Sequence, residues 1–235
     1  MSESAIKRHA LVLKSLLSGD GLRARLVRGG LGSGAVKAAG TLLSLVLALL
    51  LARVLGPAGY GVYAYVFAVV SLLSIPAQFG LPQLVLRETA RAQEVADWAA
   101  LKGVWRWAGR LALVSSLLLV LAGGGGVWLL ADRLSGVQVA TLVWGLVLIP
   151  VIVLARLRGA ALGGLRRVVA GQLPDMVLRP GLLVILVLVL MLGFDDGLTP
   201  SRAMALHALA AACAFGVGAV VLMRVRPPEL RAVRP

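Results

Sequence analysis

Long uninterrupted runs of apolar residues constrain this chain more than any other feature of its sequence. Six segments come close to the roughly 20 residues that an α-helix needs to cross a hydrocarbon core about 30 Å thick. They are residues 36–55, 62–86, 111–131, 137–155, 175–194 and 203–223. With 60% hydrophobic and only 14% charged residues, the 235-residue chain lacks the polar surface of a soluble protein. The pattern predicts an all-α integral membrane protein with a six-transmembrane-helix bundle over residues 36–223.

The positions of the basic residues test this arrangement and give its orientation. Of the 24 Lys and Arg residues, all except Arg53, Arg133 and Arg202 lie in residues 1–37, 87–110, 156–179 or 224–234. Short loops on the cytoplasmic side of a membrane are enriched in Lys and Arg. We therefore expect both termini to be cytoplasmic. The net charge of +14 is then explained by this bias rather than by binding to nucleic acid.

The two ends of the chain are predicted to lie outside the bundle. Residues 1–35 form a basic leader, in which residues 5–18 place apolar side chains along one helical face. This amphipathic helix could bind anionic membrane lipid, or the leader could be inert and only fix the topology. Residues 29–34, GGLGSG, are interpreted as a flexible joint before the first span, and residues 224–235 as a basic cytoplasmic tail.

The second predicted span carries a concentration of helix-breaking residues. Pro76, Gly80 and Pro82 each remove a backbone donor or loosen the helix, so a kink or an unwound turn is expected there. Freed backbone groups in a membrane must face protein or a water-filled cavity, and Gln83 offers a polar side chain beside them. The segment is either a hinge that lines a polar path or a structural proline kink at the membrane rim.

Ionisable residues near the span ends are the candidates for binding an anionic substrate. Asp175 and Arg179 stand four residues apart and would pair on one face of an α-helix. Lys37, Arg53 and Arg87 could each present a cation to an anionic ligand. Each of these residues could equally anchor a helix end by extending its charged group into the headgroup layer.

The sequence contains few residues of the types that act in catalysis or bind metal ions. Cys213 is the single cysteine, and His9 and His207 are far apart in the sequence with no further ligand at helical spacing. No catalytic constellation is evident, so we expect no metal, no cofactor and no enzymatic activity.

A resemblance to a known family rests on residues 37–91. The turn Ala52–Gly56, followed by Gly59, Tyr60 and Gly61, and the step Gly80–Arg87 resemble the opening of the bacterial polysaccharide and oligosaccharide flippase family. That family belongs to the multidrug, oligosaccharidyl-lipid and polysaccharide exporter superfamily. Residues 156–180 also resemble the family's cytoplasmic linker into its fifth helix.

The resemblance implies a transporter of the bacterial cytoplasmic (inner) membrane. Its substrate would be an undecaprenyl-pyrophosphate-linked oligosaccharide, moved to the outer face by alternating access for cell-surface polysaccharide such as O-antigen. Cationic residues would meet the pyrophosphate. Family members contain two six-helix lobes, and the six spans here correspond to the amino-terminal one. The partner lobe would come from a homodimer or a separately encoded half.

Two other classes of function remain open from the sequence. The chain could be a non-transporting membrane scaffold or a truncated half-transporter. It could also be a membrane-embedded glycosyl or acyl transferase, which normally needs acidic or histidine residues at the interface. The predicted outer side offers only Asp132, Asp195 and Asp196 for that purpose.

Overall fold

The computed structural model describes residues 22–193 and 197–229, with side chains from residue 29 onward. The predicted surface helix at residues 5–18, the acidic pair Asp195 and Asp196, and the last residues of the tail lie outside this part. The regular elements in chain order are α2 (Leu22–Gln78), α3 (Leu81–Val95), α4 (Trp98–Leu129), η1 (Ala131–Arg133), α5 (Gly136–Gly164), α6 (Val168–Leu173), η2 (Pro174–Leu178), α7 (Arg179–Gly193) and α8 (Pro200–Val225). Every element in the described part is therefore helical.

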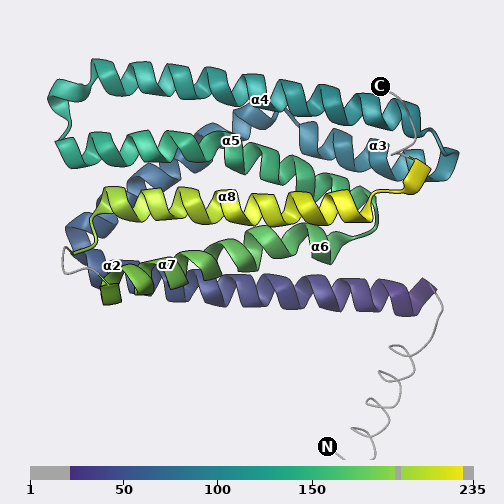
Figure 1. Cartoon of the computed structure of the whole chain (residues 1–235), viewed down its shortest axis with the longest axis horizontal. Coiled ribbons are helices and arrows are strands. Elements are labelled where there is room, and N and C mark those ends of the chain that lie inside the picture. The colour runs from purple at the N-terminus through teal and green to yellow at the C-terminus, as the bar shows by residue number, and fades with distance from the viewer. Residues whose placement is uncertain (1–21, 194–196, 230–235) are drawn as a thin grey trace, which may run out of the picture.

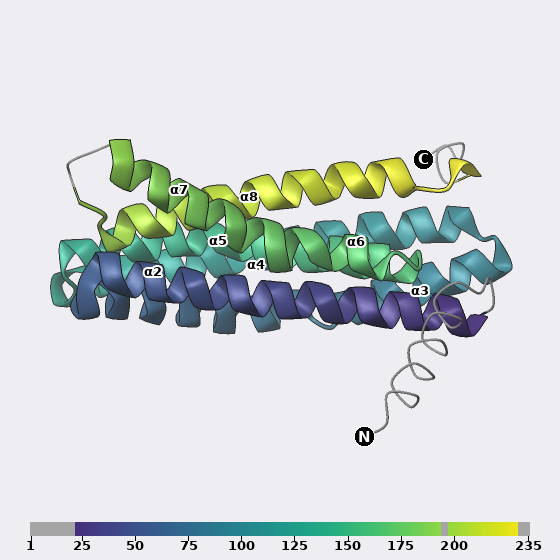
Figure 2. The same cartoon turned by 90° about the horizontal axis from the view of Figure 1, so that it is seen from below.

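Five helical stretches in the described part are long and apolar enough to cross a membrane. The predicted all-α class is confirmed for the described residues, whereas the six crossings and the orientation stay predictions. The helices lie side by side along one axis (Figure 1). The start of α2, the α3–α4 connection and the end of α8 lie at one end of the bundle, as the view turned by 90° also shows (Figure 2). The bend in α2, η1 and the start of α8 lie at the opposite end.

Helix α2 is bent back on itself at Gly56. This residue has φ 68° and ψ 173°, a backbone conformation that a side chain would strain, and Pro57 follows it at the first position of the next helical turn. The result is two arms that run in opposite directions, residues 22–55 and residues 57–78 (Figure 1). The predicted spans 36–55 and 62–86 left the residues between them as a loop, but a single glycine makes the reversal.

The first arm also differs from expectation at its beginning. The helix starts at Leu22 and continues through residues 29–34, so the glycine-rich segment interpreted as a flexible joint is part of the helix. The predicted boundary at residue 36 came from the apolar run alone. Hydropathy marks where a helix meets lipid, whereas the backbone can remain helical beyond that point.

The other helices are longer than their apolar runs for the same reason. Helix α4 begins 13 residues before the predicted residue 111, where Asp97 caps it by accepting a hydrogen bond from the Ala100 amide at 3.0 Å. Helix α5 begins with a capping box between Ser135 and Gln138 and continues nine residues beyond the predicted end at 155. The polar residues of the linkers are thus part of the helices.

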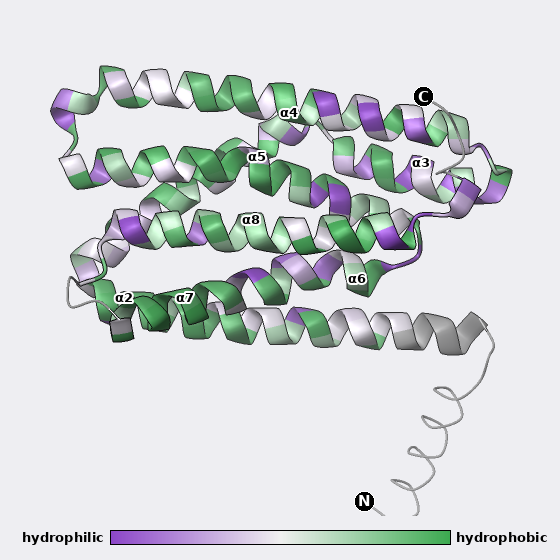
Figure 3. Ribbon diagram, viewed as in Figure 1, coloured by the Kyte–Doolittle hydropathy of each residue, from purple (hydrophilic) through white to green (hydrophobic). Residues whose placement is uncertain are grey.

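Helix α5 lies at the centre of the bundle and packs against α2, α3, α4, α6 and α8. Helix α8 contacts it along a face of small residues, among them Ala203, Ala211 and Gly218, which are buried. Small residues let two helix backbones approach closely, as expected for an interior helix in a membrane bundle. Many large apolar side chains on the outer surface are exposed, including Leu42, which is 65% exposed. Such a surface suits contact with lipid, and hydrophilic residues gather instead at the end that holds α3 and the start of α4 (Figure 3).

Candidate functional site

A half-open cleft of about 750 Å³ lies between the second arm of α2, α3, α5, α6 and η2. This volume is within the range of small-molecule binding sites, about 300–1,000 Å³. Its polar side chains are Gln78, Gln83, Arg156, Gln172, Asp175 and Arg179. The residues chosen from the sequence that line it are Gly80, Pro82, Gln83, Asp175 and Arg179. Residues that are distant in the sequence therefore meet in one polar space inside an apolar bundle.

The edge of the cleft is an interruption between α2 and α3. Phe79 has φ 43° and Gly80 has φ 70°, so the helix ends at Gln78 and a new one begins at Leu81. This break lies inside the segment for which Pro76, Gly80 and Pro82 predict a kink or an unwound turn. Gly80 accepts hydrogen bonds from the amides of the next helical turn at 3.1 and 3.2 Å, which satisfies its carbonyl at the new N-terminus.

The opposite wall of the cleft contains a π-helical turn, η2. The amide of Arg179 donates to the carbonyl of Pro174, five residues earlier. Pro180 has no amide hydrogen and cannot donate to the carbonyl of Met176, so the regular α-helical pattern is lost at this point. Gly40 in the first arm of α2 lies against that carbonyl, because an added Cβ would come within 2.6 Å of it. The wider turn places Asp175 on the cleft wall.

Arg179 lies deeper in the bundle than the sequence suggested. The predicted span began at residue 175, which would put Arg179 at a membrane edge. The helical stretch instead runs over Val168–Gly193, and Arg179 is close to its middle. Among the described residues, no acceptor receives a hydrogen bond from its guanidinium, and no carboxylate lies within ion-pair distance. A charged group near the middle of a stretch that is long and apolar enough to cross a membrane is a candidate for a functional residue.

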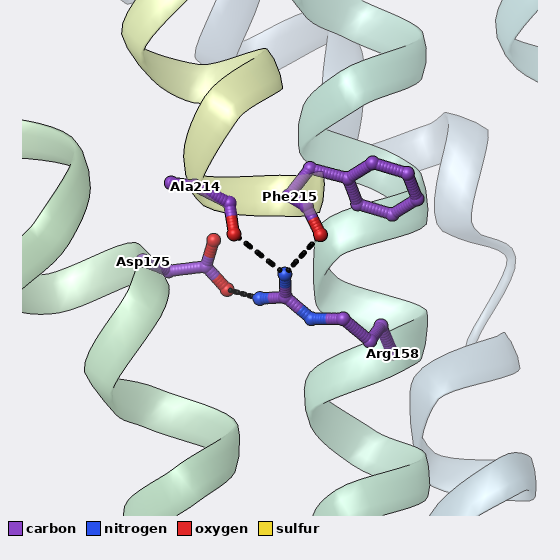
Figure 4. A network of polar contacts seen from close by, with 4 residues as sticks. All are labelled: Arg158, Asp175, Ala214 and Phe215. Atoms are coloured by element: carbon purple, nitrogen blue, oxygen red, sulfur yellow. Dashed lines mark hydrogen bonds and ion pairs between the residues drawn. The ribbon is translucent and has the colours of Figure 1, made fainter. Parts of the chain in front are cut away.

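Arg158 forms the best-connected polar contact near the cleft (Figure 4). Its Nη2 donates to Oδ2 of Asp175 at 2.9 Å, and its Nη1 donates to the carbonyls of Ala214 and Phe215 at 3.1 and 3.0 Å. The Arg158 side chain is 4% exposed and that of Asp175 is 31% exposed. The predicted pairing of Asp175 with Arg179 is therefore wrong, because Asp175 pairs with Arg158. The contact joins α5, η2 and α8.

Gly218 makes room for this contact. A Cβ at Gly218 would overlap with the Arg158 guanidinium and lie 2.7 Å from its Nε. From the sequence, Arg158 falls within the predicted cytoplasmic segment 156–179, so its role inside the bundle was not predicted. A signal was present, because the residues one turn away, Ala155, Ala161 and Leu162, are all apolar and are all buried. An arginine with only apolar neighbours at this spacing is unusual for a solvated linker.

A second, smaller cavity of about 180 Å³ lies between the two arms of α2, α7 and α8. Arg179 lines this cavity as well as the cleft. On its wall, the hydroxyl of Tyr63 and Nδ1 of His207 share a buried hydrogen bond of 2.7 Å. The ring of Phe67 packs on His207 at a centroid distance of 4.9 Å. His207 thus has a hydrogen-bond partner within an aromatic cluster.

The remaining residues chosen from the sequence lie outside the cleft. Lys37, Arg53 and Pro76 are exposed on the two arms of α2. The side chain of Arg87 is 75% exposed, and its Nε lies 3.3 Å from Oε1 of Glu88. This arrangement of helices does not bring these side chains together at one site where they could all contact an anionic substrate. Among residues 22–193 and 197–229, no group of three His, Cys, Asp or Glu residues could hold a metal ion.

Comparison with known proteins gives the family. No curated protein and no solved structure matches the chain. A family model described as "Polysaccharide biosynthesis protein" matches residues 26–229, which include all six predicted spans and every residue of the cleft. The chain therefore belongs to the polysaccharide biosynthesis protein family, which includes flippases and exporters and whose members are generally transporters rather than enzymes.

Proposed function

We propose that the chain is a flippase lobe that moves an undecaprenyl-pyrophosphate-linked oligosaccharide across the bacterial cytoplasmic membrane. Family membership supports a role in polysaccharide biosynthesis, and the polar cleft supports a path for a charged, hydroxyl-rich substrate through an apolar bundle. The observation that carries the proposal is Arg179, a cation near the middle of a membrane-spanning stretch with no acceptor among its described neighbours. A pyrophosphate would supply that acceptor through charge-assisted hydrogen bonds.

The proposal includes six membrane crossings. Helix α2 supplies two of them, one on each side of Gly56, and α6 with α7 supplies one. With this assignment, the start of α2, the α3–α4 connection and the end of α8, which are predicted to be cytoplasmic, lie at one end of the bundle, and the bend in α2, η1 and the start of α8 lie at the other (Figure 1). The cleft opens in the half of the bundle that contains α3 and α6, so we assign it to the cytoplasmic side. Substrate made inside the cell would enter there.

The chemistry of the cleft suits the two parts of such a substrate. Arg179 and Arg156 present guanidinium groups that match the geometry of phosphate oxygens. Gln78, Gln83 and Gln172 carry amide groups that both donate to and accept from sugar hydroxyls. The apolar outer surface of the helices would accompany the polyprenyl tail, which remains in lipid.

Alternating access requires parts of the lobe that can change their relative positions. The break at Phe79 and Gly80 and the π-helical turn at residues 174–178 lie on opposite sides of the cleft. Both interrupt the α-helical hydrogen-bond pattern, so both can absorb a change in helix direction. We propose that Pro76, Gly80 and Pro82 form a hinge on one wall. A second six-helix lobe, from another copy or a separate chain, would close the far side of the path.

A transport assay on Arg179 tests the proposal. In a bacterial host that lacks its own copy of the gene, the chain or its Arg179→Gln variant is supplied, and the lipid-linked glycan exposed on the outer face of spheroplasts is measured with a glycan-binding lectin. We expect Arg179→Gln to abolish most of the exposure and Arg179→Lys to keep a part of it. The matched control is Arg110→Gln, an exposed arginine of α4 outside the cleft.

Membrane levels of each variant are measured by immunoblot, so that loss of protein is separated from loss of transport. Full exposure of the glycan with Arg179→Gln at normal protein level refutes the role of Arg179. Full exposure when the gene is absent altogether refutes the transport function and favours a scaffold.

A further inference from the structure

A third pocket, of about 260 Å³ and mostly apolar apart from two arginines, lies across α5 from the cleft. The residues of α5 that line it are Leu154, Leu157, Arg158 and Ala161, which follow the spacing of a single helical face. The residues of α5 that line the cleft are Ile152, Ala155, Arg156, Gly159, Ala160 and Gly163. At about 100° per residue these two sets point in opposite directions. The pocket is therefore separate from the proposed transport path.

Two arginines give the pocket its charge. The guanidinium of Arg226 lies over the ring of Trp105 at 5.6 Å, and that of Arg158 lies over Phe215 at 5.7 Å. In both arginines Nε is buried and has no hydrogen-bond partner among the described residues. Arg158 already uses its other nitrogens, whereas no described acceptor receives a hydrogen bond from Arg226. None of the described residues that line the pocket is acidic.

The rest of the lining is apolar and comes from α3, α4, α5 and α8. Trp105 is held by a hydrogen bond from its Nε1 to Oγ1 of Thr89 at 2.9 Å, so the face of its ring is fixed toward Arg226. Tryptophan is enriched at the interface between lipid tails and headgroups. On the rim of the pocket, Met223 is 50% exposed and offers an apolar surface to a lipid tail.

Size and charge together indicate the occupant. A pocket of about 260 Å³ is smaller than the usual range for a whole small molecule, about 300–1,000 Å³, so it would hold a headgroup while the tails stay outside. A phosphate would provide the negatively charged acceptor that the Arg226 guanidinium lacks among the described residues. A zwitterionic headgroup would add a positive charge beside two arginines, which disfavours it. Basic pockets between membrane helices on the cytoplasmic side bind acidic phospholipids in this way.

We propose that this pocket binds an acidic phospholipid of the surrounding leaflet, with its phosphate on Arg226 and its tails along the apolar rim. The site does not depend on the identity of the transported substrate. It does have a physical connection to the cleft, because Arg158 lines the pocket and also binds Asp175 on the cleft wall. A bound lipid would therefore be separated from the cleft only by the Arg158 side chain and its ion pair with Asp175.

Lipid binding to the purified full chain tests the proposal directly. Native mass spectrometry from detergent is used to compare retention of phosphatidylglycerol with that of phosphatidylcholine of the same chain length. Arg226→Gln removes the charge, and Ala219→Leu fills the pocket without changing charge. The matched control is Arg224→Gln, which removes an exposed arginine from the same helix end outside the pocket. Inorganic phosphate and glycerol 3-phosphate are added as competitors to separate a lipid from a free anion.

We expect phosphatidylglycerol to be retained in preference to phosphatidylcholine. One arginine near a membrane surface contributes about 1 kcal/mol, so Arg226→Gln should weaken retention about fivefold. Ala219→Leu should weaken it as well, and Arg224→Gln should not. Ala219→Leu alone decides the outcome if Arg226→Gln does not yield folded protein.

Three results would overturn the proposal. Equal weakening by Arg226→Gln and Arg224→Gln would indicate general electrostatic attraction to the basic tail. Unchanged retention in Ala219→Leu would show that the lipid lies elsewhere. Displacement of phosphatidylglycerol by glycerol 3-phosphate or inorganic phosphate at equal concentration would mean that the pocket takes a free anion rather than a lipid.

Discussion

Replacing Gly218 with alanine tests how firmly the Arg158 guanidinium is held between α5, η2 and α8. The new methyl group would occupy the position of the guanidinium, so the arginine side chain must move and release its hydrogen bonds to Ala214, Phe215 and Asp175. Gly216 is the matched control, because it lies two residues earlier in the same helix and an added Cβ there meets nothing within 4 Å.

The expected difference follows from those contacts. Hydrogen bonds between helices in a membrane contribute on average about 0.6 kcal/mol each, so the loss of three costs about 2 kcal/mol. Alanine is also a better helix former than glycine by about 1 kcal/mol, but both variants share this gain. Gly218→Ala should therefore be about 2 kcal/mol less stable than Gly216→Ala. For a chain of this size, that difference lowers the melting temperature by about 4–8 °C.

Thermal unfolding in detergent measures this difference. The chain contains five tryptophans, so intrinsic fluorescence reports unfolding without a label. Both variants are purified and melted side by side at the same protein and detergent concentrations. Equal melting temperatures for the two variants would show that the guanidinium moves aside at no cost, and the inferred rigidity of the contact would then be wrong.

Two further predictions concern the ion pair and the topology. Asp175→Asn keeps the shape of the side chain but leaves the buried charge of Arg158 without its counter-ion, so we expect a loss of about 1.5–3 kcal/mol, measured by the same melting assay. A melting temperature equal to that of the wild type would mean that the carboxylate charge of Asp175 does not contribute to stability. In a background without Cys213, a cysteine at exposed Ala58 should react with a membrane-impermeant maleimide added to intact spheroplasts, whereas one at exposed Glu94 should react only after permeabilisation. Labelling of the Glu94 position in intact spheroplasts would contradict the assigned orientation.

Much of the bundle could be predicted from the sequence because lipid imposes a simple requirement. A helix must remain apolar for about 20 residues to cross the hydrocarbon core, and residues 111–131 and 137–155 meet it without a single charge. The same requirement says nothing about where the helix ends in water. Helix α4 therefore begins at Trp98, well before its apolar run. Only local capping residues such as Asp97 mark such an end.

The partners within the site were harder to predict. The pairing of Asp175 with Arg179 assumed regular α-helical spacing, but the π-helical turn changes the relative direction of the two side chains. The true partner, Arg158, lies 17 residues away on another helix, and its apolar neighbours at helical spacing mark it as unusual without indicating which residue it pairs with. Arg179, Gln83 and Gly80 stand out in the sequence as polar or helix-breaking residues in apolar surroundings, and all three line the cleft. Their convergence on one cleft depends on how the helices pack.

The reversal at Gly56 has a consequence for how the protein enters the membrane. Because one residue turns the chain, the two arms of α2 share no connecting segment that could stay behind in water while one arm inserts alone. They should pass into the bilayer together as a hairpin during synthesis. Even a short insertion between Leu55 and Pro57 would separate the arms at their tips, so this position should tolerate changes in length far less well than the connection between η1 and α5.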